Sequence, residues 1–560
     1  MSEKRYFIIL LCFCFGLVTA QDKKNSTVIE YHFYNQNTPS DEPYLYVAVN
    51  GSTNKIWRAN EKTNDQVKNW SNTSFVDYKN KLVYQQTQTK EGKIFATQDT
   101  LNTDLSSFEF KEEYKSILGY KCQKAVTVIQ SNVIELWFTT KPSFKASPRM
   151  VGNYMGLVLE ISYNGQYSWK AVNIKKMALD HVAFITPDLN TLLSKQAHAD
   201  SLWKASFTTL QIFKKQQINF NPKVQTDVLN HKYAYGTLVA KKITLPEIKK
   251  TTRVFMQLKQ NSLGDAYDRT GSVFIIPTEK AINYLEAMQG HPDQLPVYPS
   301  TDGQTHRGIT TTSEFDPVLE LMRFFTPFGI KHYNQQSSSS IQWQDQTQLR
   351  QEITNVIHSL KSREIWVGCY IGNYDVGGHQ IDLDFTFHQD DTENTNFNFN
   401  KPLCNTLNIL EMNGFHYPSF FEDPKGLKFD FELQDDVENA TLRYITTGHG
   451  GWSNGDEFQS KENTIFLNGQ RIHQFIPWRE DCGSFRSLNP ASGNFDNGLS
   501  SSDLSRSNWC PGTITQPIYI KLGNLKAGKH QMQITIPQSA AAGANRSYWN
   551  VSAVLLGNTK

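Results

Sequence analysis

Short runs of alternating apolar and polar residues recur along the chain, and this pattern restricts it to a sheet-based fold. In the run IDLDFTFH, residues 381–388, every second residue is apolar and the residues between are polar. A period of two places one set on a buried strand face and the other on a wet face. Similar short runs separated by turn residues fill residues 401–560 and predict a β-sandwich there. We therefore predict an all-β fold.

The composition supports this interpretation and divides the chain into parts. Of the 560 residues, 39% are hydrophobic, 20% are charged and 12% are aromatic, which is typical of a globular chain rich in half-buried sheets. We predict an N-terminal β-rich accessory domain over residues 21–220, a second domain over 221–400 and a third over 401–560. Two exceptions to the strand pattern are a partly helical segment within residues 186–210 and a helix over 349–360. Apolar residues fall on one face of that second helix: Leu349, Ile353, Val356, Ile357 and Leu360.

Charge and hydropathy exclude some functions. The formal net charge is +2, without the basic surplus that a nucleic-acid binder shows. No run of about 18 apolar residues follows the N-terminus, so we expect no membrane span. Residues 1–20 carry Lys4 and Arg5, then an apolar stretch that ends in Val-Thr-Ala. This pattern predicts a cleavable signal peptide, a mature chain that begins near Gln21, and a secreted or periplasmic protein.

Five cysteines remain after residue 20, and an oxidising compartment favours pairing of some of them. Cys482 and Cys510 bracket one loop rich in Gly, Asn and Ser, and are the best candidates for a disulfide. Because five is odd, at least one thiol stays free or pairs between chains. No CxxC motif is present, so zinc is not expected. Asp382, Asp384 and His388 share one strand face and could hold a metal, but a solvated face explains them better.

Three polar segments resist a purely structural interpretation. In NSLGDAYDRTGSVFIIP, residues 261–277, two acids, a tyrosine and an arginine crowd the entrance of an apolar strand. A solvated turn explains Asp265, and the two acids, the aromatic residue and the arginine also suit a sugar-binding rim. The glycine-rich stretch 446–469 contains His449, Trp452, Asp456, Glu457 and Phe458. In SRSNWCPG, residues 505–512, Arg506 and Trp509 lie beside Cys510, where a disulfide would brace them.

Together these segments resemble the peptide-N-glycosidase F family over roughly residues 240–558. Four motifs occur in the family's order: DAYDR at 265–269, LELMRFFTPF at 319–328, GDEF at 455–458 and SRSNWCPG at 505–512. The resemblance implies two antiparallel jelly rolls side by side, with the site at their interface. The additional N-terminal residues match the longer, second type of the enzyme.

The resemblance also assigns roles by position. Asp268 would be the main catalytic acid, Glu457 the second carboxylate and Arg506 the cation beside it. The pattern differs from the shorter enzyme at several positions: Tyr267 and His449 replace tryptophans, and Tyr370 and Gly372 replace a Glu and a Trp. The residues that we expect to bind substrate are Tyr267, Arg269, Tyr370, Gly372, His449, Phe458 and Trp509.

The implied activity is hydrolysis of the amide between an asparagine side chain and the first GlcNAc, without metal or cofactor. The whole N-glycan would leave and aspartate would remain in the peptide. The partners would be the chitobiose core and its carrier glycoprotein or glycopeptide, bound by a monomeric enzyme. Gly372 would leave room for a 3-linked fucose on the core. Two alternatives are a carbohydrate-binding or adhesin protein without turnover, and a glycosidase that uses Asp268 and Glu457 as its acid pair.

Overall fold

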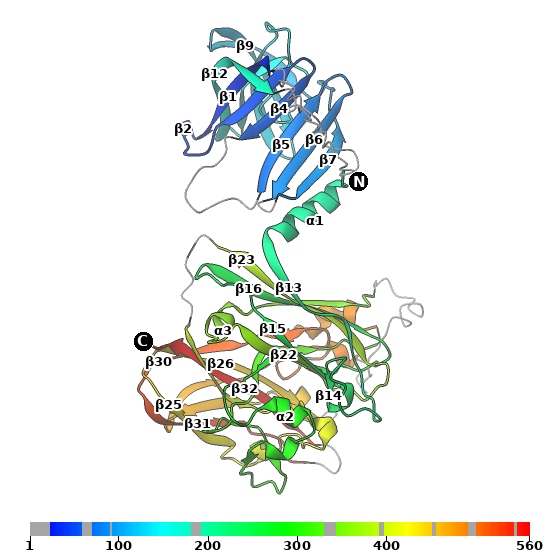
Figure 1. Cartoon of the computed structure of the whole chain (residues 1–560), viewed down its shortest axis with the longest axis vertical. Helices are drawn as coiled ribbons and strands as arrows, with labels where there is room; N and C mark the ends of the chain where they lie inside the picture. Colours follow the sequence, from blue (N-terminus) through cyan, green and yellow to red (C-terminus); the bar gives the residue numbers. More distant parts are fainter. Residues whose placement is uncertain are drawn as a thin grey trace, which may run out of the picture. The chain divides into compact units, whose positions relative to one another are not determined.

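The computed structural model describes residues 23–58, 70–89, 92–180, 192–329, 343–390, 392, 397–450, 455–490, 500–541 and 546–560 (Figure 1). These residues form two compact units, 1–206 and 207–560. Both units consist mainly of antiparallel strands, which confirms the all-β prediction. The expected signal peptide and Trp452 lie outside the described residues.

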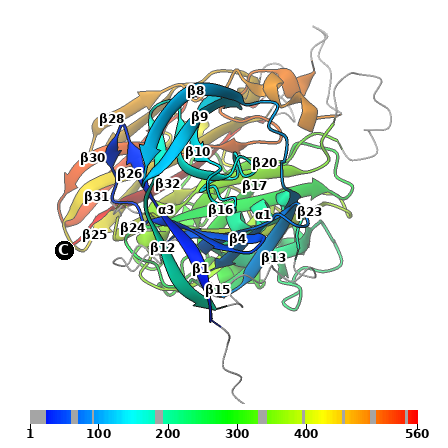
Figure 2. The same cartoon turned by 90° about the horizontal axis from the view of Figure 1, so that it is seen from above.

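The first unit is one antiparallel sheet with the strand order β7-β6-β5-β4-β3-β1-β12-β11-β10-β9-β8, and β2 pairs with β1. Figure 2 shows β8 and β9 curving away from β1 and β4. The helix α1, Lys195–Ala205, confirms the helical segment expected within 186–210, and Ser194 caps it by accepting a hydrogen bond from the Ala197 backbone N–H. The strands are β1 Lys23–Asn35, β2 Thr38–Pro39, β3 Leu45–Asn50, β4 Thr53–Arg58, β5 Trp70–Asp77, β6 Leu82–Thr89, β7 Ile94–Thr100, β8 Glu109–Ile117, β9 Tyr120–Ile129, β10 Asn132–Thr139, β11 Leu157–Tyr163 and β12 Tyr167–Asp180.

The second unit begins with a jelly roll made of two sheets. One has the order β13-β23-β16-β21, with bounds Phe207–Ile218, His379–Gln389, Thr252–Ser262 and Thr347–Glu352. The other has the order β14-β15-β22-β17-β20-β29, with bounds Lys232–Tyr233, Leu238–Thr244, Glu364–Ile371, Thr270–Ile276, Leu319–Phe325 and Ile514–Thr515. The alternating run at 381–388 is part of β23, and its four apolar side chains are buried in the core.

The helix predicted over 349–360 is mostly wrong. Leu349 lies in strand β21, opposite Leu258 of β16, and only Thr354–His358 form the short helix α3. Ile353, Val356 and Ile357 are at most 2% exposed. A strand followed by one helical turn therefore buries the same apolar residues that a continuous helix would bury, and the sequence period alone cannot separate the two.

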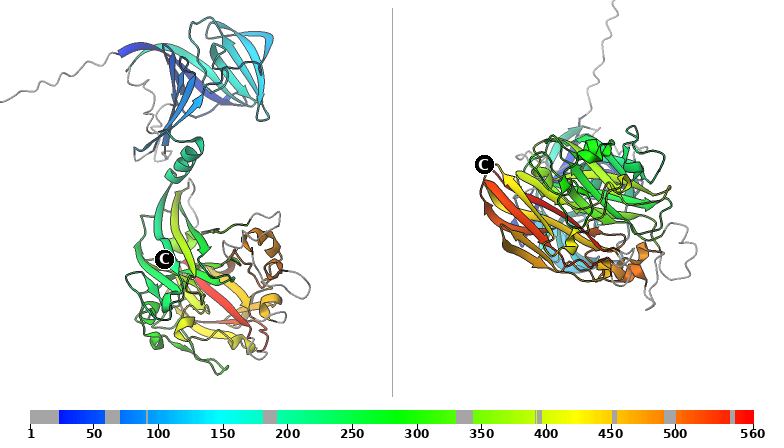
Figure 3. Two further views of the ribbon diagram at one scale, coloured as in Figure 1. Left: turned by 90° about the vertical axis from the view of Figure 1, so that its right-hand side faces the viewer. Right: turned by 90° about the horizontal axis from the view of Figure 1, so that it is seen from below.

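A second jelly roll lies beside the first, as Figure 3 shows with the yellow-to-red strands next to the green ones. Its sheets have the orders β24-β32-β26-β30 and β25-β31-β27-β28. Their bounds are Phe399–Asn405, Tyr548–Asn558, Val437–His449 and Ile518–Leu525 for the first sheet, and Leu427–Leu433, Gly528–Thr535, Asn463–Leu467 and Gln470–Phe475 for the second. A β-sandwich was expected over 401–560, and these strands lie between Phe399 and Asn558.

Two buried arginines join the jelly rolls. Arg323 of β20 is fully buried, pairs with Glu320 at 2.7 Å, and donates to the carbonyl of Asn550 on β32. Arg443 of β26 donates to the Glu320 and Leu321 carbonyls, both at 2.7 Å. Since a buried charge without partners costs several kcal/mol, about 3–5 when one partner is removed, these contacts restrict the relative position of the jelly rolls.

Candidate active site

Asp268 lies in the turn between β16 and β17, where the sequence analysis placed it. Its side chain is 16% exposed. The turn is fixed on both sides, because the backbone N–H of Arg269 donates to the Thr326 hydroxyl at 2.8 Å and the Thr326 hydroxyl donates to the carbonyl of Tyr267 at 2.9 Å. The carboxylate is thus held at the edge of the first jelly roll by backbone contacts on either side of it.

Glu457 comes from the second jelly roll, in the single helical turn Asp456–Phe458 that follows β26. The neighbouring Asp456 is fully buried and accepts a hydrogen bond from the indole of Trp549 at 2.8 Å. The backbone N–H of Ser507 donates to the Glu457 carbonyl at 3.0 Å. Asp456 therefore anchors the turn, which leaves the Glu457 side chain, 21% exposed, to face the site.

Arg506 is buried, and its guanidinium is restrained from several directions. Its backbone pairs with that of Arg479, and Nη2 donates to the Ser501 carbonyl at 2.6 Å. The guanidinium carbon lies 4.9 Å from the centre of the Phe458 ring and 4.4 Å from that of Trp509. A disulfide between Cys482 and Cys510 closes the loop that carries Arg506, which confirms the predicted pair. Cys122, Cys369 and Cys404 are free and buried.

The three charged groups meet at one atom. Nη1 of Arg506 donates to Oδ2 of Asp268 at 3.1 Å and also to Oε1 of Glu457. Burial raises the pKa of Asp268, Arg506 opposes this rise, and the nearby charge of Glu457 adds to it, so the pKa reaches about 7. Burial likewise raises the pKa of Glu457 against the effect of Arg506. Two carboxyl groups beside one cation therefore retain a proton near neutral pH, which suits proton transfer.

A second arginine next to Asp268 is bound elsewhere. Nε of Arg269 donates to Asp265 at 2.7 Å, and Nε2 of His379 lies 3.5 Å from the same carboxylate oxygen. Burial alone would raise the pKa of Asp265, but the hydrogen bonds from His379 and Arg269 outweigh it and lower the pKa to about 2. Asp265 thus remains ionised and pairs with Arg269. Asp268 forms its hydrogen bond with Arg506 instead.

Tyrosines surround Arg269 at the rim of the site. The guanidinium carbon lies 4.9 Å from the Tyr267 ring centre and 5.4 Å from that of Tyr374. The Tyr374 hydroxyl donates to Glu411, and burial together with this carboxylate raises the pKa of Tyr374 to about 12. The Tyr370 hydroxyl donates to the other oxygen of Glu411 at 3.3 Å. Tyr370, which the resemblance aligned with the family's glutamate, therefore contacts a carboxylate from another segment.

Gly372 lies next to the strand that Asp268 precedes, since its backbone N–H donates to the Thr270 carbonyl at 3.0 Å. A Cβ atom at Gly372 would lie 2.7 Å from the Tyr370 hydroxyl. Any side chain here would consequently displace that hydroxyl and reduce the space beside it.

His449 and Trp509 belong to a stack of rings behind the charged groups. Trp509 stacks on Phe325 at 4.3 Å, and His449 stacks on Tyr548 at 5.1 Å. Burial, with Arg323 and Arg506 nearby, lowers the pKa of His449 well below its usual range. His449 and Trp509 are 4% and 3% exposed, and the His449 ring centre lies 5.3 Å from that of Trp509, whose ring packs against the Arg506 guanidinium.

The structure thus gathers Asp268, Glu457, Arg506 and Phe458, with Tyr267 and Arg269 at the rim. Glu411 and Tyr374 were missed as site residues. Tyr374 ends the segment CYIGNY, in which the sequence analysis considered only two earlier positions. Glu411 lies in the segment LEMNG, residues 410–414, which gave no motif.

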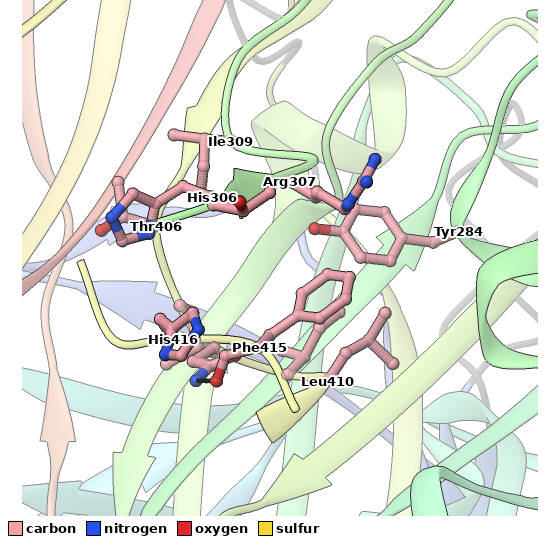
Figure 4. Close-up of a pocket in the computed structure, with 12 residues that line it drawn as sticks. Tyr284, His306, Arg307, Ile309, Thr406, Leu410, Phe415 and His416 are labelled. Atoms are coloured by element: carbon pink, nitrogen blue, oxygen red, sulfur yellow. Dashed lines mark hydrogen bonds between the residues drawn. The ribbon is translucent and has the colours of Figure 1, made fainter. Parts of the chain in front are cut away.

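A separate small cavity lies near Tyr284, His306 and Phe415 (Figure 4). None of the predicted site residues lines it, so it does not contribute to the charged centre. Among the described residues no group of three or more His, Cys, Asp or Glu side chains has the arrangement of a metal site, and no helix is long and apolar enough to cross a membrane.

Comparisons with known proteins cover most of the chain. Three family models match: N-glycanase peptide, N-terminal domain, over residues 29–197; Peptide-N-glycosidase F, N terminal, over 209–387; and Peptide-N-glycosidase F, C terminal, over 416–556. Two crystal forms of PNGF-II are 43% and 42% identical, with 96% of this chain and 99% and 100% of theirs covered, and a TM-score of 0.87 each. A structure of recombinant peptide: N-glycanase F (PNGase F) is 14% identical over 63% of this chain and 96% of that one, with a TM-score of 0.41. No curated protein matches.

Proposed function

The chain belongs to the peptide-N-glycosidase F family and is an amidase of the peptide-N4-(N-acetyl-beta-glucosaminyl)asparagine type, and we propose that Asp268, Glu457 and Arg506 carry out the hydrolysis. The observation that carries this assignment is the shared atom: Nη1 of Arg506 contacts both carboxyl groups, which come from different jelly rolls. Amide hydrolysis needs an activated water, a stabilised oxyanion and a protonated leaving nitrogen, and these three groups can supply each of them.

Asp268 is the general base of the proposed reaction. In its ionised form it accepts a proton from water as the water oxygen attacks the side-chain carbonyl carbon of the glycosylated asparagine. Its pKa of about 7 makes it a stronger base than an ordinary aspartate, whose pKa is about 3.9. A well-placed general base contributes roughly 10²–10⁴-fold to the rate.

Arg506 and Glu457 assist the step. The Arg506 guanidinium stabilises the negative charge that develops on the carbonyl oxygen, and Glu457 holds the guanidinium in place. The proton then passes to the leaving nitrogen as the carbon–nitrogen bond breaks. The products are an aspartate in the peptide and a glycosylamine, which loses ammonia in water.

A glycopeptide with one N-glycan tests the assignment by mass spectrometry. The amidase converts asparagine to aspartate, a gain of about one dalton over the unglycosylated peptide, and releases the whole glycan. Recovery of Asn or Asn-GlcNAc would show a glycosidase instead. Recovery of the intact glycopeptide would show a binding protein without turnover.

We further propose tolerance of a 3-linked fucose on the innermost GlcNAc. The absence of a side chain at Gly372, beside Thr270 and the Tyr370 hydroxyl, supports this. Gly372→Trp should lower kcat/KM for core-3-fucosylated glycopeptides at least 10-fold more than for plain ones. Gly372→Ala is the matched control, because its methyl group also displaces the Tyr370 hydroxyl but fills little space. Equal losses on the two substrates would refute the proposal.

We also propose that the protein is exported and acts as a monomer. The signal-peptide pattern of residues 1–20 and the disulfide between Cys482 and Cys510 support export, since disulfides persist in oxidising compartments. N-terminal sequencing of the exported protein should find Gln21 first. Sedimentation of that protein should give the mass of one chain.

A further inference from the structure

We infer that two paired loops beside the catalytic centre bind the polypeptide that carries the glycan through Leu263 and Val376, the aliphatic side chains that they expose. We name this surface the apolar lip: Leu263 and Tyr267 on the loop after β16, and Tyr374 and Val376 on the loop after β22. These side chains are 45%, 61%, 52% and 69% exposed, respectively. The inference rests on the proposed function, because it concerns the peptide part of the same substrate.

The two loops lie in direct contact. The backbone N–H of Leu263 donates to the Gly378 carbonyl at 2.8 Å, which continues the pairing of β16 with β23. A Cβ atom at Gly377 would lie 2.6 Å from the Leu263 carbonyl oxygen, so only glycine permits this approach. The two loops that carry Leu263 and Val376 therefore lie against each other.

The loop after β22 is fixed by hydrogen bonds that use its own polar groups. Oδ1 of Asp375 accepts from the backbone N–H of Gly377 at 2.7 Å and of Gly378 at 2.8 Å. Side-chain amides satisfy the next two carbonyls: Asn219 donates to Val376 at 2.8 Å, and Gln217 donates to Gly377 at 2.9 Å. Most polar groups beside Val376 are thus already bonded within the protein, and what the loop presents there is mainly apolar.

The inner and outer halves of the lip differ in chemistry. Tyr267 and Tyr374 flank Arg269, next to Asp268, and offer polar tips and a guanidinium that suit sugar hydroxyls. The outer half consists of Leu263, five residues before Asp268 in the sequence, and Val376, two residues after Tyr374, and it offers only aliphatic surface. Recognition of a sugar needs hydrogen-bonding groups, whereas apolar amino-acid side chains bind through buried area alone.

The substrate has a polar part, the glycan, and a part that can be apolar, the polypeptide, and both adjoin the scissile amide. At the scissile amide one side of the substrate is glycan and the other is polypeptide, and an extended chain spans about 3.3–3.6 Å per residue. We therefore expect residues next to the glycosylated asparagine to meet the outer half of the lip when the amide lies at Asp268. Exposed apolar patches that adjoin a functional site mark interaction surfaces. We expect apolar residues flanking the asparagine to be preferred.

A pair of glycopeptides with the same glycan tests this inference. One carries leucine at the positions that flank the glycosylated asparagine, and the other carries serine there. For the wild-type protein we expect kcat/KM to be roughly 10-fold higher for the leucine peptide. The double variant Leu263→Ser/Val376→Ser should reduce this ratio below about 3-fold, with the serine peptide unaffected. The matched control is Val297→Ser/Ile476→Ser, at two side chains that are 54% and 56% exposed on other elements.

Each alternative result contradicts a different statement. No preference in the wild-type protein, or a preference that survives in the lip variant, would overturn the inference while aspartate formation still supports the amidase. Equal losses on both peptides in the lip variant would assign the lip to the glycan and also overturn it. Failure of the wild-type protein to form aspartate from either peptide would overturn the proposed function together with this inference.

Discussion

Oδ2 of Asp268 lies 3.1 Å from Nη1 of Arg506, although 238 residues separate them in the sequence. Asp268 belongs to the turn after β16 in the first jelly roll, and Arg506 to the loop closed by the Cys482–Cys510 disulfide beside the second. The contact therefore exists only when both jelly rolls are folded and docked. The Arg506 cation lowers the pKa of Asp268. Burial and the nearby charge of Glu457 raise it by more, so the pKa stays above its usual value.

Asp268→Asn should abolish glycan release. An amide cannot accept a proton from water, so we expect kcat to fall by roughly 10²–10⁴-fold or more. The variant keeps nearly the same shape, so circular dichroism should match that of the wild-type protein. Asp430→Asn, at an exposed position of β25, is the control and should keep full activity. Activity of Asp268→Asn within about 10-fold of wild type would exclude Asp268 as the base.

The same variant should be more stable than the wild-type protein at alkaline pH. The pKa of Asp268 is raised to about 7 in the folded state, above about 3.9 in the unfolded chain. The stabilisation from its bound proton is complete below pH 4 and is lost as the pH rises through 7. Ionisation then costs at most about 4 kcal/mol, at 1.36 kcal/mol per pKa unit. Thermal unfolding should therefore show a higher Tm for Asp268→Asn at pH 8 and a smaller difference at pH 5.

Glu457→Gln should move the acidic limb of the pH–rate profile to lower pH. The charge of Glu457 contributes to the raised pKa of Asp268, and its removal lets Arg506 lower that pKa further. Because the base must be ionised, kcat/KM of the variant should persist at more acidic pH, although its maximum falls as Arg506 loses a partner. Profiles of kcat/KM between pH 4 and 9 measure the shift. A limb that stays in place, or moves to higher pH, would mean that the two carboxyl groups do not titrate together.

The sequence could predict those parts of the centre that depend on residues close together in the chain, and not those that depend on contacts between distant segments. Asp268, Glu457 and Arg506 lie in short motifs that a family resemblance can align, and the strands follow from alternation. Glu411 gives no such signal: it reaches the site because Tyr370 and Tyr374, 41 and 37 residues away, donate to it. These contacts join two segments that lie apart in the sequence, and no strand or helix pattern reveals which of their side chains meet. The error over 349–360 has the opposite cause, since the local period was clear but β16 was available to pair with Leu349.

Arg506→Lys should lower kcat by roughly 10²–10³-fold, the loss seen when an oxyanion donor is removed. A lysine keeps the charge but cannot donate to Asp268, Glu457 and the Ser501 carbonyl at once from a planar fork. It also loses the stacking between Phe458 and Trp509. Steady-state kinetics on one glycopeptide should show the change mainly in kcat. Arg471→Lys, exposed on β28, is the control, and equal effects of the two substitutions would argue against a specific role for Arg506.

Residues 207–560 alone should retain activity on glycopeptides. Among the described residues, the contacts of Asp268, Glu457 and Arg506 reported above come from this range, which also contains both jelly rolls. The boundary falls between α1, which ends at Ala205, and β13, which begins at Phe207, so removal of residues 1–206 leaves all strands of the second unit intact. We expect kcat/KM on a short glycopeptide within about 3-fold of the full chain, a difference below 1 kcal/mol. Cooperative thermal unfolding is the control for folding. If the shortened protein is folded but inactive on the glycopeptide, the first unit must contribute to catalysis; a loss confined to folded glycoproteins would instead assign it to recognition of the carrier protein.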